Sequence, residues 1–423
     1  MIMTKILTYI LLATGSLVWA QRPEPAPKQT QAIAIVGATI HTGTGAVLEN
    51  ATIVFNQGKI TQIGGIAPAN NAKIINAHGK HVYPGFILVN NSLGLVEIEA
   101  TKATVDYQEA NDITPEMRTL IAFNTDSHVI PTVRTNGILL TQPVMKNGLV
   151  NGTSSVMNLD AWNWEDAVVK KDNVLHIMWP KIRKSTDEKR DKEFKEKRNR
   201  ELTDLKSLLA RAKTYEKLTE KDFKLEAIKP IFSGEKSLFV EVNSANEAME
   251  VIKMAQDFAV AKLVLIGDAS LTPVLDEIKK NNIPLVIRRV HELPHSQSVS
   301  PNTPFEFAKK VADKGILYGL EYGGDMEYMG SRNLPFLAGT TVAFGVDREK
   351  ALQSLTLNLA KILGIDKDYG SLEVGKSATL FISEGDALDH LTNQVTDAFI
   401  DGRSINLNNQ QKELYHRYKE KYK

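Results

Sequence analysis

The middle of the chain alternates short apolar runs with amphipathic segments, and this alternation restricts the fold more than any other feature. Such alternation is typical of parallel β-α units. The expected strands are residues 137–140, 238–242, 263–266, 284–287 and 316–320, and the expected helices are residues 245–258, 271–281, 304–314 and 349–363. The span from Pro84 to Val346 has the length of an eight-unit barrel, roughly 250 residues. An open doubly wound sheet is the alternative, but no Gly-x-Gly-x-x-Gly motif follows a strand.

Short strands joined by glycine turns flank this region on both sides. Residues 31–80 and residues 347–405 both show this pattern, which predicts antiparallel sheet. We therefore expect an α/β protein: a (β/α)8 TIM-like barrel over residues 81–346 and a small composite β-sandwich domain built from both chain ends. Residues 406–423 are expected to form a charged C-terminal helix or tail.

The first thirty residues indicate export. Residues 1–20 carry Lys5, an apolar run from Ile6 to Leu12, and small residues at Val18 and Ala20, as in a signal peptide that is cleaved before residue 21. The apolar run is short for a hydrocarbon core of about 30 Å, so no stable membrane anchor is expected. Residues 21–30 contain three prolines and are predicted to be a linker. The expected location is periplasmic or secreted.

Composition narrows the choice of partners. Lys and Arg number 51 against 50 for Asp and Glu, so no net field attracts nucleic acid, and a small molecule or a protein is the more natural partner. The chain has no cysteine, which excludes disulfides and thiolate ligands. The charge-dense stretch 181–224 predicts either a solvated helix with i,i+4 ion pairs or an electrostatic docking surface.

One segment carries a family resemblance. Residues 84–92 read Pro-Gly-Phe-Ile-Leu-Val-Asn-Asn-Ser and closely resemble the metal-binding strand of the amidohydrolase superfamily, Pro-Gly-Phe-Ile-Asp-x-His-x-His. Residues 351–364 are similar to the family's final helix, and residues 370–376 to its return to the small sheet. Residues 152–155 and 331–335 resemble the imidazolonepropionase-like branch. The resemblance covers nearly the whole mature chain and implies a hydrolase of non-peptide C–N bonds.

The resemblance also implies a metal, but this chain departs from the ligand pattern. The family normally binds zinc or another divalent metal, whose bound water attacks the substrate. Here the paired histidines are Asn90 and Ser92, and Leu88 stands at the aspartate position. The expected fifth and sixth strands are followed by Asn243 and Asp268 without histidine. Amide and hydroxyl oxygens bind zinc far less well than imidazole, so we expect an altered site and no cofactor.

Two groups of residues are candidates for the remaining chemistry. The family's eighth-strand carboxylate is assigned to Asp325, with Glu321 as a second possibility; a loop with an Asx turn is the structural alternative. His291 and His295 form a His-Glu-x-x-His pattern that Pro294 keeps from being helical, but a pocket-lining loop remains open. The full set of pocket candidates is Asn90, Ser92, Glu321, Arg332, His291 and His295. Residues 152–155 and 331–335 are expected in loops that follow strands.

Two functions from different classes follow. The first is hydrolysis at an atypical site around Asp325, Glu321, His291 and His295. The second is a non-catalytic role, as a binding protein or as the partner subunit of an active amidohydrolase paralogue. A small-molecule ligand fits either function, and a homo-oligomer is a further possibility.

Overall fold

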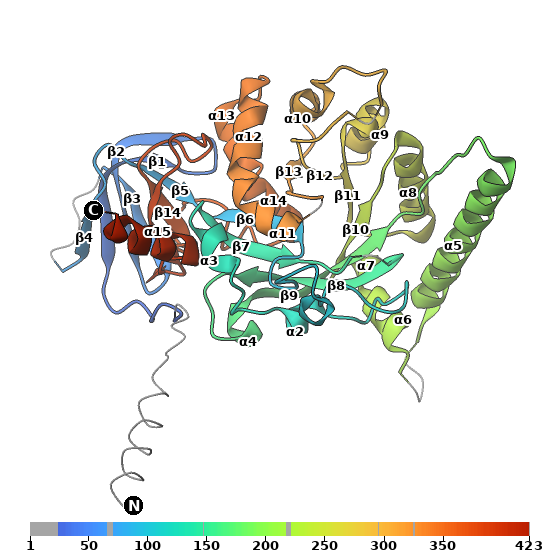
Figure 1. The fold of residues 1–423 in the computed structure, drawn as a ribbon, viewed down its shortest axis with the longest axis horizontal. Helices are drawn as coiled ribbons and strands as arrows, with labels where there is room; N and C mark the ends of the chain where they lie inside the picture. The colour runs from blue at the N-terminus through green and yellow to red at the C-terminus, as the bar shows by residue number, and fades with distance from the viewer. Residues whose placement is uncertain are drawn as a thin grey trace, which may run out of the picture.

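A computed structural model describes residues 24–65, 71–146, 148–216, 221–294, 296–324 and 326–422. The expected signal peptide, residues 1–20, lies outside these ranges. Within them, no helix combines the length and the apolar character needed to cross a membrane. Figure 1 shows a sheet domain at one side, a strand-and-helix barrel in the centre and the long helix α5 (Glu188–Thr214) at the far side.

The sheet domain joins the two ends of the chain. Its strands are β1 (Ile33–His41), β2 (Val47–Asn56), β3 (Lys59–Gly64), β4 (Lys73–Asn76), β5 (His81–Pro84), β14 (Leu380–Ser383), β15 (Val395–Ile400) and β16 (Arg403–Ser404). The order is β16-β15-β14-β5-β1-β2-β3, and β4 pairs with β1. The C-terminal β14 pairs antiparallel with β5, from Leu380 opposite Pro84 to Ser383 opposite His81. Ile35, Ile53 and Phe399 lie in its core.

The barrel consists of a second eight-stranded sheet. Its strands are β6 (Phe86–Asn91), β7 (Ile138–Pro143), β8 (Val150–Asn158), β9 (Val168–Met178), β10 (Ser237–Glu241), β11 (Leu263–Gly267), β12 (Leu285–Ile287) and β13 (Tyr318–Leu320), adjacent in chain order. Successive residues of a strand face opposite sides of a sheet. Accordingly, Leu88 belongs to the cluster that packs with the outer helices, and Ile87 and Val89 to the cluster that packs with α14 (Leu357–Leu363). The predicted barrel with a composite sheet domain is confirmed.

One strand runs against the barrel. β8 is antiparallel to both β7 and β9, whereas an all-parallel barrel was expected. The reason is the short connections: residues 144–149 join β7 to β8, and residues 159–167 join β8 to β9. A parallel crossover needs a dozen residues or more. Residues 152–155, expected in a loop, lie inside β8 and are buried.

The seam between the first and last strands is bridged by a turn. Leu320 N donates to Ser354 O at 3.1 Å, and Ile87 N donates to Leu355 O at 2.9 Å. The turn that carries Ser354 and Leu355 connects α13 (Arg348–Gln353) to α14. α14 also holds the start of β13, because Asn358 Nδ2 donates to Tyr318 O at 2.9 Å. Residues 347–363, grouped with the sheet domain from sequence, thus complete the barrel.

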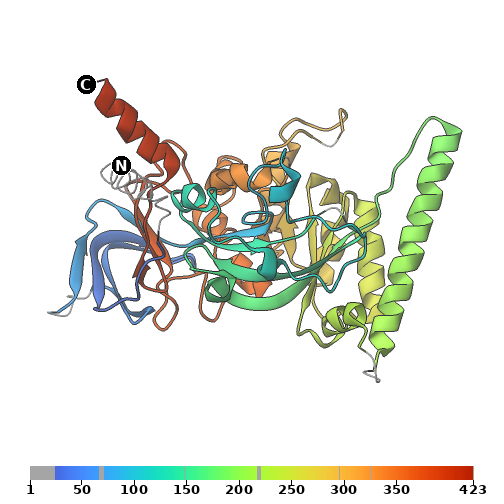
Figure 2. The same ribbon diagram turned by 60° about the horizontal axis from the view of Figure 1, so that its bottom comes forward.

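The remaining helices surround the strands or follow the last strand of the sheet domain. They are α2 (Thr119–Ala122), α3 (Ile130–Arg134), α4 (Trp164–Ala167), α6 (Phe223–Ile228), α7 (Pro230–Ser233), α8 (Ala245–Phe258), α9 (Leu275–Lys280), α10 (Thr303–Asp313), α11 (Glu327–Gly330), α12 (Leu334–Ala343) and α15 (Gln410–Lys421), with 3-10 turns η1 (Lys102–Thr104), η2 (Ala269–Val274) and η3 (Ser331–Asn333). In Figure 2 both α15 and α5 stand away from the body of the molecule.

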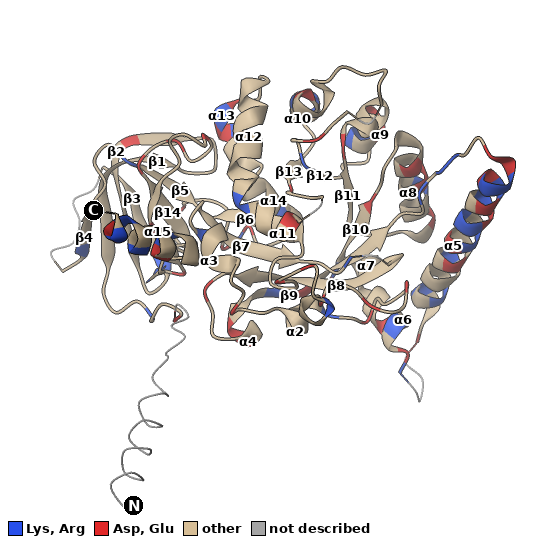
Figure 3. Cartoon of the chain, viewed as in Figure 1, with Lys and Arg blue, Asp and Glu red and all other residues tan. Residues whose placement is uncertain are grey.

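Helix α5 has the charged surface that its sequence indicates. Both signs of charge alternate along it in Figure 3, and i,i+4 ion pairs join Lys195 to Asp191 at 2.7 Å and Lys197 to Glu201 at 3.6 Å. Leu205 and Leu209 on its inner side are fully buried. A solvated helix with one apolar face accounts for this pattern. The docking-surface alternative stays a prediction.

Candidate functional site

The carboxyl ends of the barrel strands carry polar and charged side chains from almost every strand. In β-α barrels this end holds the functional residues. The contributing residues are Asn90 at the end of β6, Lys146 after β7, His176 in β9, Glu241 at the end of β10, Asp268 after β11, Arg288 after β12, Glu321 after β13 and Glu327 in α11. We call this set the mouth cluster.

Asn90 and Glu321 form the most buried contact of the mouth cluster. Asn90 Nδ2 donates to Glu321 Oε2 at 2.6 Å, and the two residues are 3% and 2% exposed. The backbone of Asn90 has a φ of 51°, a left-handed conformation that asparagine tolerates better than most residues. This conformation turns the end of β6, so that the amide of Asn90 meets the carboxylate that follows β13.

A second carboxylate is held beside the first. Ser92 N donates to Glu327 Oε1 at 3.0 Å, and Glu327 is 8% exposed. The ammonium of Lys146 lies 3.6 Å from Glu327 Oε1 and donates to Asn90 O at 3.2 Å. Lys146 therefore connects both predicted positions of the first strand, Asn90 and Ser92, to one cation.

Burial and neighbouring charges shift the acid–base properties of this group. Burial, with a further contribution from Glu241, raises the pKa of Glu321 to about 8 against the opposing effects of Lys146 and Asn90. Burial likewise raises the pKa of Glu327. Burial alone would lower the pKa of Lys146, but the carboxylates of Glu327, Glu321 and Glu241 outweigh it and raise that pKa. At neutral pH, Lys146 is charged and Glu321 is mostly protonated.

Arg288 provides a second cation on the opposite side of the mouth cluster. Its guanidinium lies 3.7 Å from Glu241 Oε1 and 3.9 Å from Asp268 Oδ2. It also donates to Val242 O at 2.6 Å and to Asn243 Oδ1 at 3.2 Å. Arg288 thus joins the ends of β10, β11 and β12.

A chain of neutral groups supports the cluster from strands β7 to β9. Asn90 N donates to Gln142 Oε1 at 3.2 Å, Gln142 Nε2 donates to Ser154 Oγ at 3.0 Å, and Ser154 Oγ lies 2.7 Å from His176 Nε2. Burial, with the charge of Lys146 adding to it, lowers the pKa of His176 to about 3. His176 is therefore neutral at physiological pH and positions its neighbours through hydrogen bonds.

The structure brings together only part of the predicted site. Asn90, Ser92 and Glu321 belong to one buried group, whereas Asp325 and His295 lie outside the described residues. His291 is exposed and its Nε2 lies 2.6 Å from Thr340 Oγ1, away from the mouth cluster. The side chain of Arg332 is exposed on η3, and its carbonyl accepts a hydrogen bond from Asn136, just before β7 begins.

Several members of the mouth cluster were missed from sequence, although a usable signal was present. Glu241 and Arg288 are each the first charged residue at the end of a predicted strand, the position at which barrels place functional groups. Glu327 and Lys146 lie a few residues past β13 and β7. Sequence does not show that these two side chains turn back toward Ser92.

The donor set was compared with the needs of a divalent metal. Asn90 and Ser92 stand where the resemblance implies imidazoles, and Asn90 uses its amide nitrogen as a donor to Glu321. The Lys146 ammonium is next to Glu327. Across the described ranges, no three His, Cys, Asp or Glu side chains come together in a way that could hold a metal ion. These residues do not fit the family's ligand set.

With a charged, polar mouth on a β-α barrel and a composite sheet domain, the chain has the architecture of a barrel hydrolase. The model of the amidohydrolase family matches residues 225–405, and the recognition of that family from sequence is thereby confirmed. The comparison with curated proteins gave no match.

Solved structures of the same family share the fold. An amidohydrolase from Thermotoga maritima is 22% identical, with 88% of this chain and 99% of that one covered and a TM-score of 0.78. Molinate hydrolase is 14% identical, with coverages of 90% and 95% and a TM-score of 0.56. A Xaa-Pro dipeptidase with bound methionine is also 14% identical, with coverages of 89% and 100% and a TM-score of 0.51. At these identities the comparisons establish the fold alone.

The family match corrects one expectation. The sequence analysis expected no cofactor, but the family that matches residues 225–405 normally binds a divalent metal, so that expectation is wrong. The altered residues at positions 90 and 92 are a property of the ligand set and do not establish that the protein works without a metal.

Proposed function

We propose that the protein is an amidohydrolase that acts on non-peptide C–N bonds through an atypical mouth cluster, with Glu321 as its proton-transferring group. The buried contact between Asn90 and Glu321 carries this proposal. Glu321 is the carboxylate at the end of the last barrel strand, and its pKa of about 8 lies near physiological pH. A group with such a pKa can both accept and return a proton during turnover.

The neighbouring residues have supporting roles in this proposal. Ionised Glu321 takes a proton from the attacking water, and Asn90 keeps the carboxylate oriented through the bond at 2.6 Å. Lys146 remains protonated and places positive charge near the oxygen on which negative charge develops. The residues present do not form the family's metal-ligand set, so none of these steps involves a metal.

Access to Glu321 depends on the turn that follows β13. A Cβ atom added to Gly323 would lie 2.8 Å from Glu321 Oε1, which places this turn directly over the carboxylate. Gly324, the next residue, has a φ of +103°, a conformation that favours glycine. Two adjacent glycines give the turn the freedom to move aside when a ligand enters.

A specific observation favours the second function, that of a binding protein or partner subunit without turnover. Asn90 and Glu321 are almost fully buried and bond to each other. A cluster whose polar groups satisfy one another is also what a structural, non-catalytic barrel would retain. The partner in that case would be an active paralogue or a second copy of this chain.

Hydrolysis of a compound panel separates the two functions. Small amides, lactams and ureas would be incubated with the full chain as purified and with added divalent metal ions. We expect turnover of at least one compound, lost by about 100-fold or more in Glu321→Gln and unchanged in Glu384→Gln, a surface control paired with Lys80. Turnover that survives Glu321→Gln would refute the role of Glu321, and no turnover of any compound would favour the binding role.

A further inference from the structure

A cavity of about 890 Å³ lies next to the mouth cluster. It is bounded by the residues that follow β12 and β13, by α12 and by the segment near residue 388. The lining residues used below are Arg289, Tyr322, Phe336, Arg348, Leu388 and His390. Ligand pockets commonly have about 300–1,000 Å³, so this cavity has room for a small organic molecule.

The cavity begins one residue away from the mouth cluster on two strands. Arg288 pairs with Glu241 in the mouth, whereas its neighbour Arg289 lines the cavity. Glu321 bonds to Asn90, whereas its neighbour Tyr322 lines the cavity. The guanidinium carbon of Arg289 lies 4.8 Å from the centre of the Tyr322 ring. This alternation is that of extended chain, in which successive side chains point to opposite sides.

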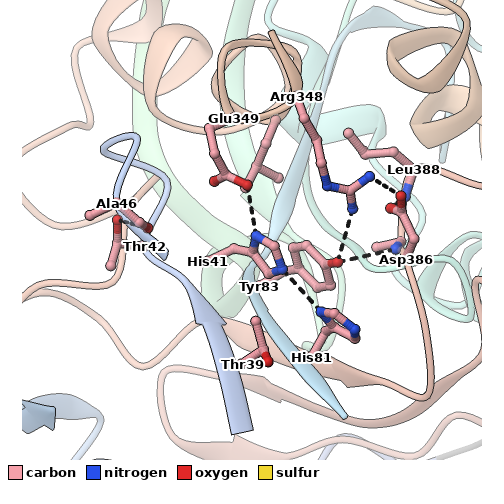
Figure 4. Close-up of polar contacts among 12 residues, drawn as sticks. Thr39, His41, Thr42, Ala46, His81, Tyr83, Arg348, Glu349, Asp386 and Leu388 are labelled. Atoms are coloured by element: carbon pink, nitrogen blue, oxygen red, sulfur yellow. Dashed lines mark hydrogen bonds and ion pairs between the residues drawn. The ribbon is translucent and has the colours of Figure 1, made fainter. Parts of the chain in front are cut away.

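The other charged groups of the cavity already have partners. Arg348 is ion-paired with Asp386, and its Nη2 lies 3.4 Å from Tyr83 Oη, as Figure 4 shows. Through that hydroxyl it joins the polar group that links the sheet domain to α13, in which His41 Nδ1 contacts Glu349 Oε1 at 2.7 Å. His390 Nδ1 lies 3.8 Å from Asp389 Oδ1.

Arg289 differs from these groups. Among the described residues it makes no ion pair and no side-chain hydrogen bond; its contact is the Tyr322 ring, and its buried Nε has no partner. Glu292 acts on it electrostatically, but burial, with a contribution from Asp268, raises the pKa of Glu292 to about 7 against the effects of Arg288 and Arg289. Glu292 is therefore only partly charged at neutral pH and neutralises Arg289 incompletely.

We propose that Arg289 binds the carboxylate of a small ligand, and that the substrate class is N-acyl amino acids with an apolar side chain. This inference rests on the proposed function, since it places an acyl C–N bond beside the mouth cluster. One unpaired cation fits a monoanionic carboxylate better than a phosphate dianion, and a guanidinium can bind both carboxylate oxygens. Phe336, Val342 and Leu388 give the cavity apolar walls for the rest of the ligand.

Direct binding tests this inference without turnover. Calorimetry would compare N-acetyl-L-phenylalanine with N-acetyl-L-phenylalaninamide, which lacks the negative charge, in the Glu321→Gln background so that neither probe is consumed. We expect the acid to bind about ten-fold or more tightly than the amide. Arg289→Gln should bring the two affinities together, and Arg289→Lys should retain part of the preference.

The controls keep the outcomes distinct. Arg332→Gln, which removes an exposed arginine on η3, should leave the preference unchanged. Equal affinities for the two probes, a preference that persists in Arg289→Gln, or no binding of either probe up to on the order of 10 mM would each overturn the inference. Stronger competition by inorganic phosphate than by acetate would replace the carboxylate with a phosphate. Because binding is measured without turnover, a preference for the acid would stand even if the proposed hydrolysis failed.

Discussion

At the scale of single residues, the mouth cluster shows how position can be predicted while interaction cannot. The resemblance of residues 84–92 located Asn90 and Ser92 correctly at the end of the first barrel strand. It did not show that Asn90 takes a φ of 51° or that its amide reaches a carboxylate 231 residues away in sequence. Such contacts depend on the closure of the barrel, which brings its first and last strands together.

The raised pKa of Glu321 gives a pH-dependent stability. In the folded protein this pKa is about 8, against an ordinary value of 4.5, so folding favours the protonated form. Its contribution to stability is fully present below pH 4.5 and is lost as the pH rises through about 8. Replacing Glu321 by Gln, which can accept the same bond from Asn90, should remove this loss.

Chemical unfolding at several pH values measures this effect. Between pH 4.5 and about 8, the free energy of unfolding of the wild type should fall more steeply than that of Glu321→Gln, by at most about 1.4 kcal/mol per pH unit. Glu384→Gln is the matched surface control and should follow the wild type. Parallel curves for the wild type and Glu321→Gln would show that Glu321 titrates in the fold as it does in water.

At the scale of elements, periodicity was a good guide to strands and helices of the second half. Residues 245–258 form α8 with the predicted bounds, and residues 304–314 match α10 within one residue. The antiparallel β8 was missed because its short connections, rather than its apolar content, decide its direction. The bridging turn at Ser354 and Leu355 was missed for a different reason: it replaces strand pairing with two backbone hydrogen bonds, and no side-chain pattern encodes them.

Gly319 tests the tight packing at this seam. A Cβ atom at Gly319 would lie 2.2 Å from Leu359 Cδ2 and 3.2 Å from Ser354 O, so Gly319→Ala must displace α14 or the bridging turn. We expect a loss of about 1–3 kcal/mol in the free energy of unfolding, measured by urea denaturation. Gly65→Ala, where an added Cβ meets nothing within 4 Å, should change it by less than about 0.5 kcal/mol. Equal stabilities of the two variants would contradict the packing described here.

At the scale of the whole molecule, the two chain ends depend on each other. β14 lies between β15 and β5, so the C-terminal strands complete the sheet that the N-terminal strands begin. Sequence predicted this composite domain because both ends show the same strand-and-turn pattern. It could not place residues 347–363, whose helical pattern is compatible with either domain until the contacts of α14 with Tyr318 and with the first barrel strand are known.

Truncation tests this dependence. Removing residues 370–423 deletes β14, β15 and β16 and leaves the edge of β5 unpaired, together with apolar side chains such as Phe55 and Val82 that pack against the missing strands. We expect insoluble protein, because an exposed apolar strand edge promotes aggregation. Removing residues 410–423, which deletes only the exposed helix α15, should leave the protein soluble. A soluble, cooperatively unfolding 1–369 fragment would contradict the composite domain.

The pH dependence of hydrolysis tests the central claim most directly. It would be measured as kcat/KM from pH 6 to 10 on the compound of the panel that is hydrolysed fastest. If Glu321 is the proton acceptor, log kcat/KM should rise with a slope of about one and level off near pH 8, following the pKa of that carboxyl. Glu321→Gln should lose activity at every pH in this range. A profile that is flat from pH 6 to 10, or a bend near pH 8 that remains in Glu321→Gln, would contradict the account.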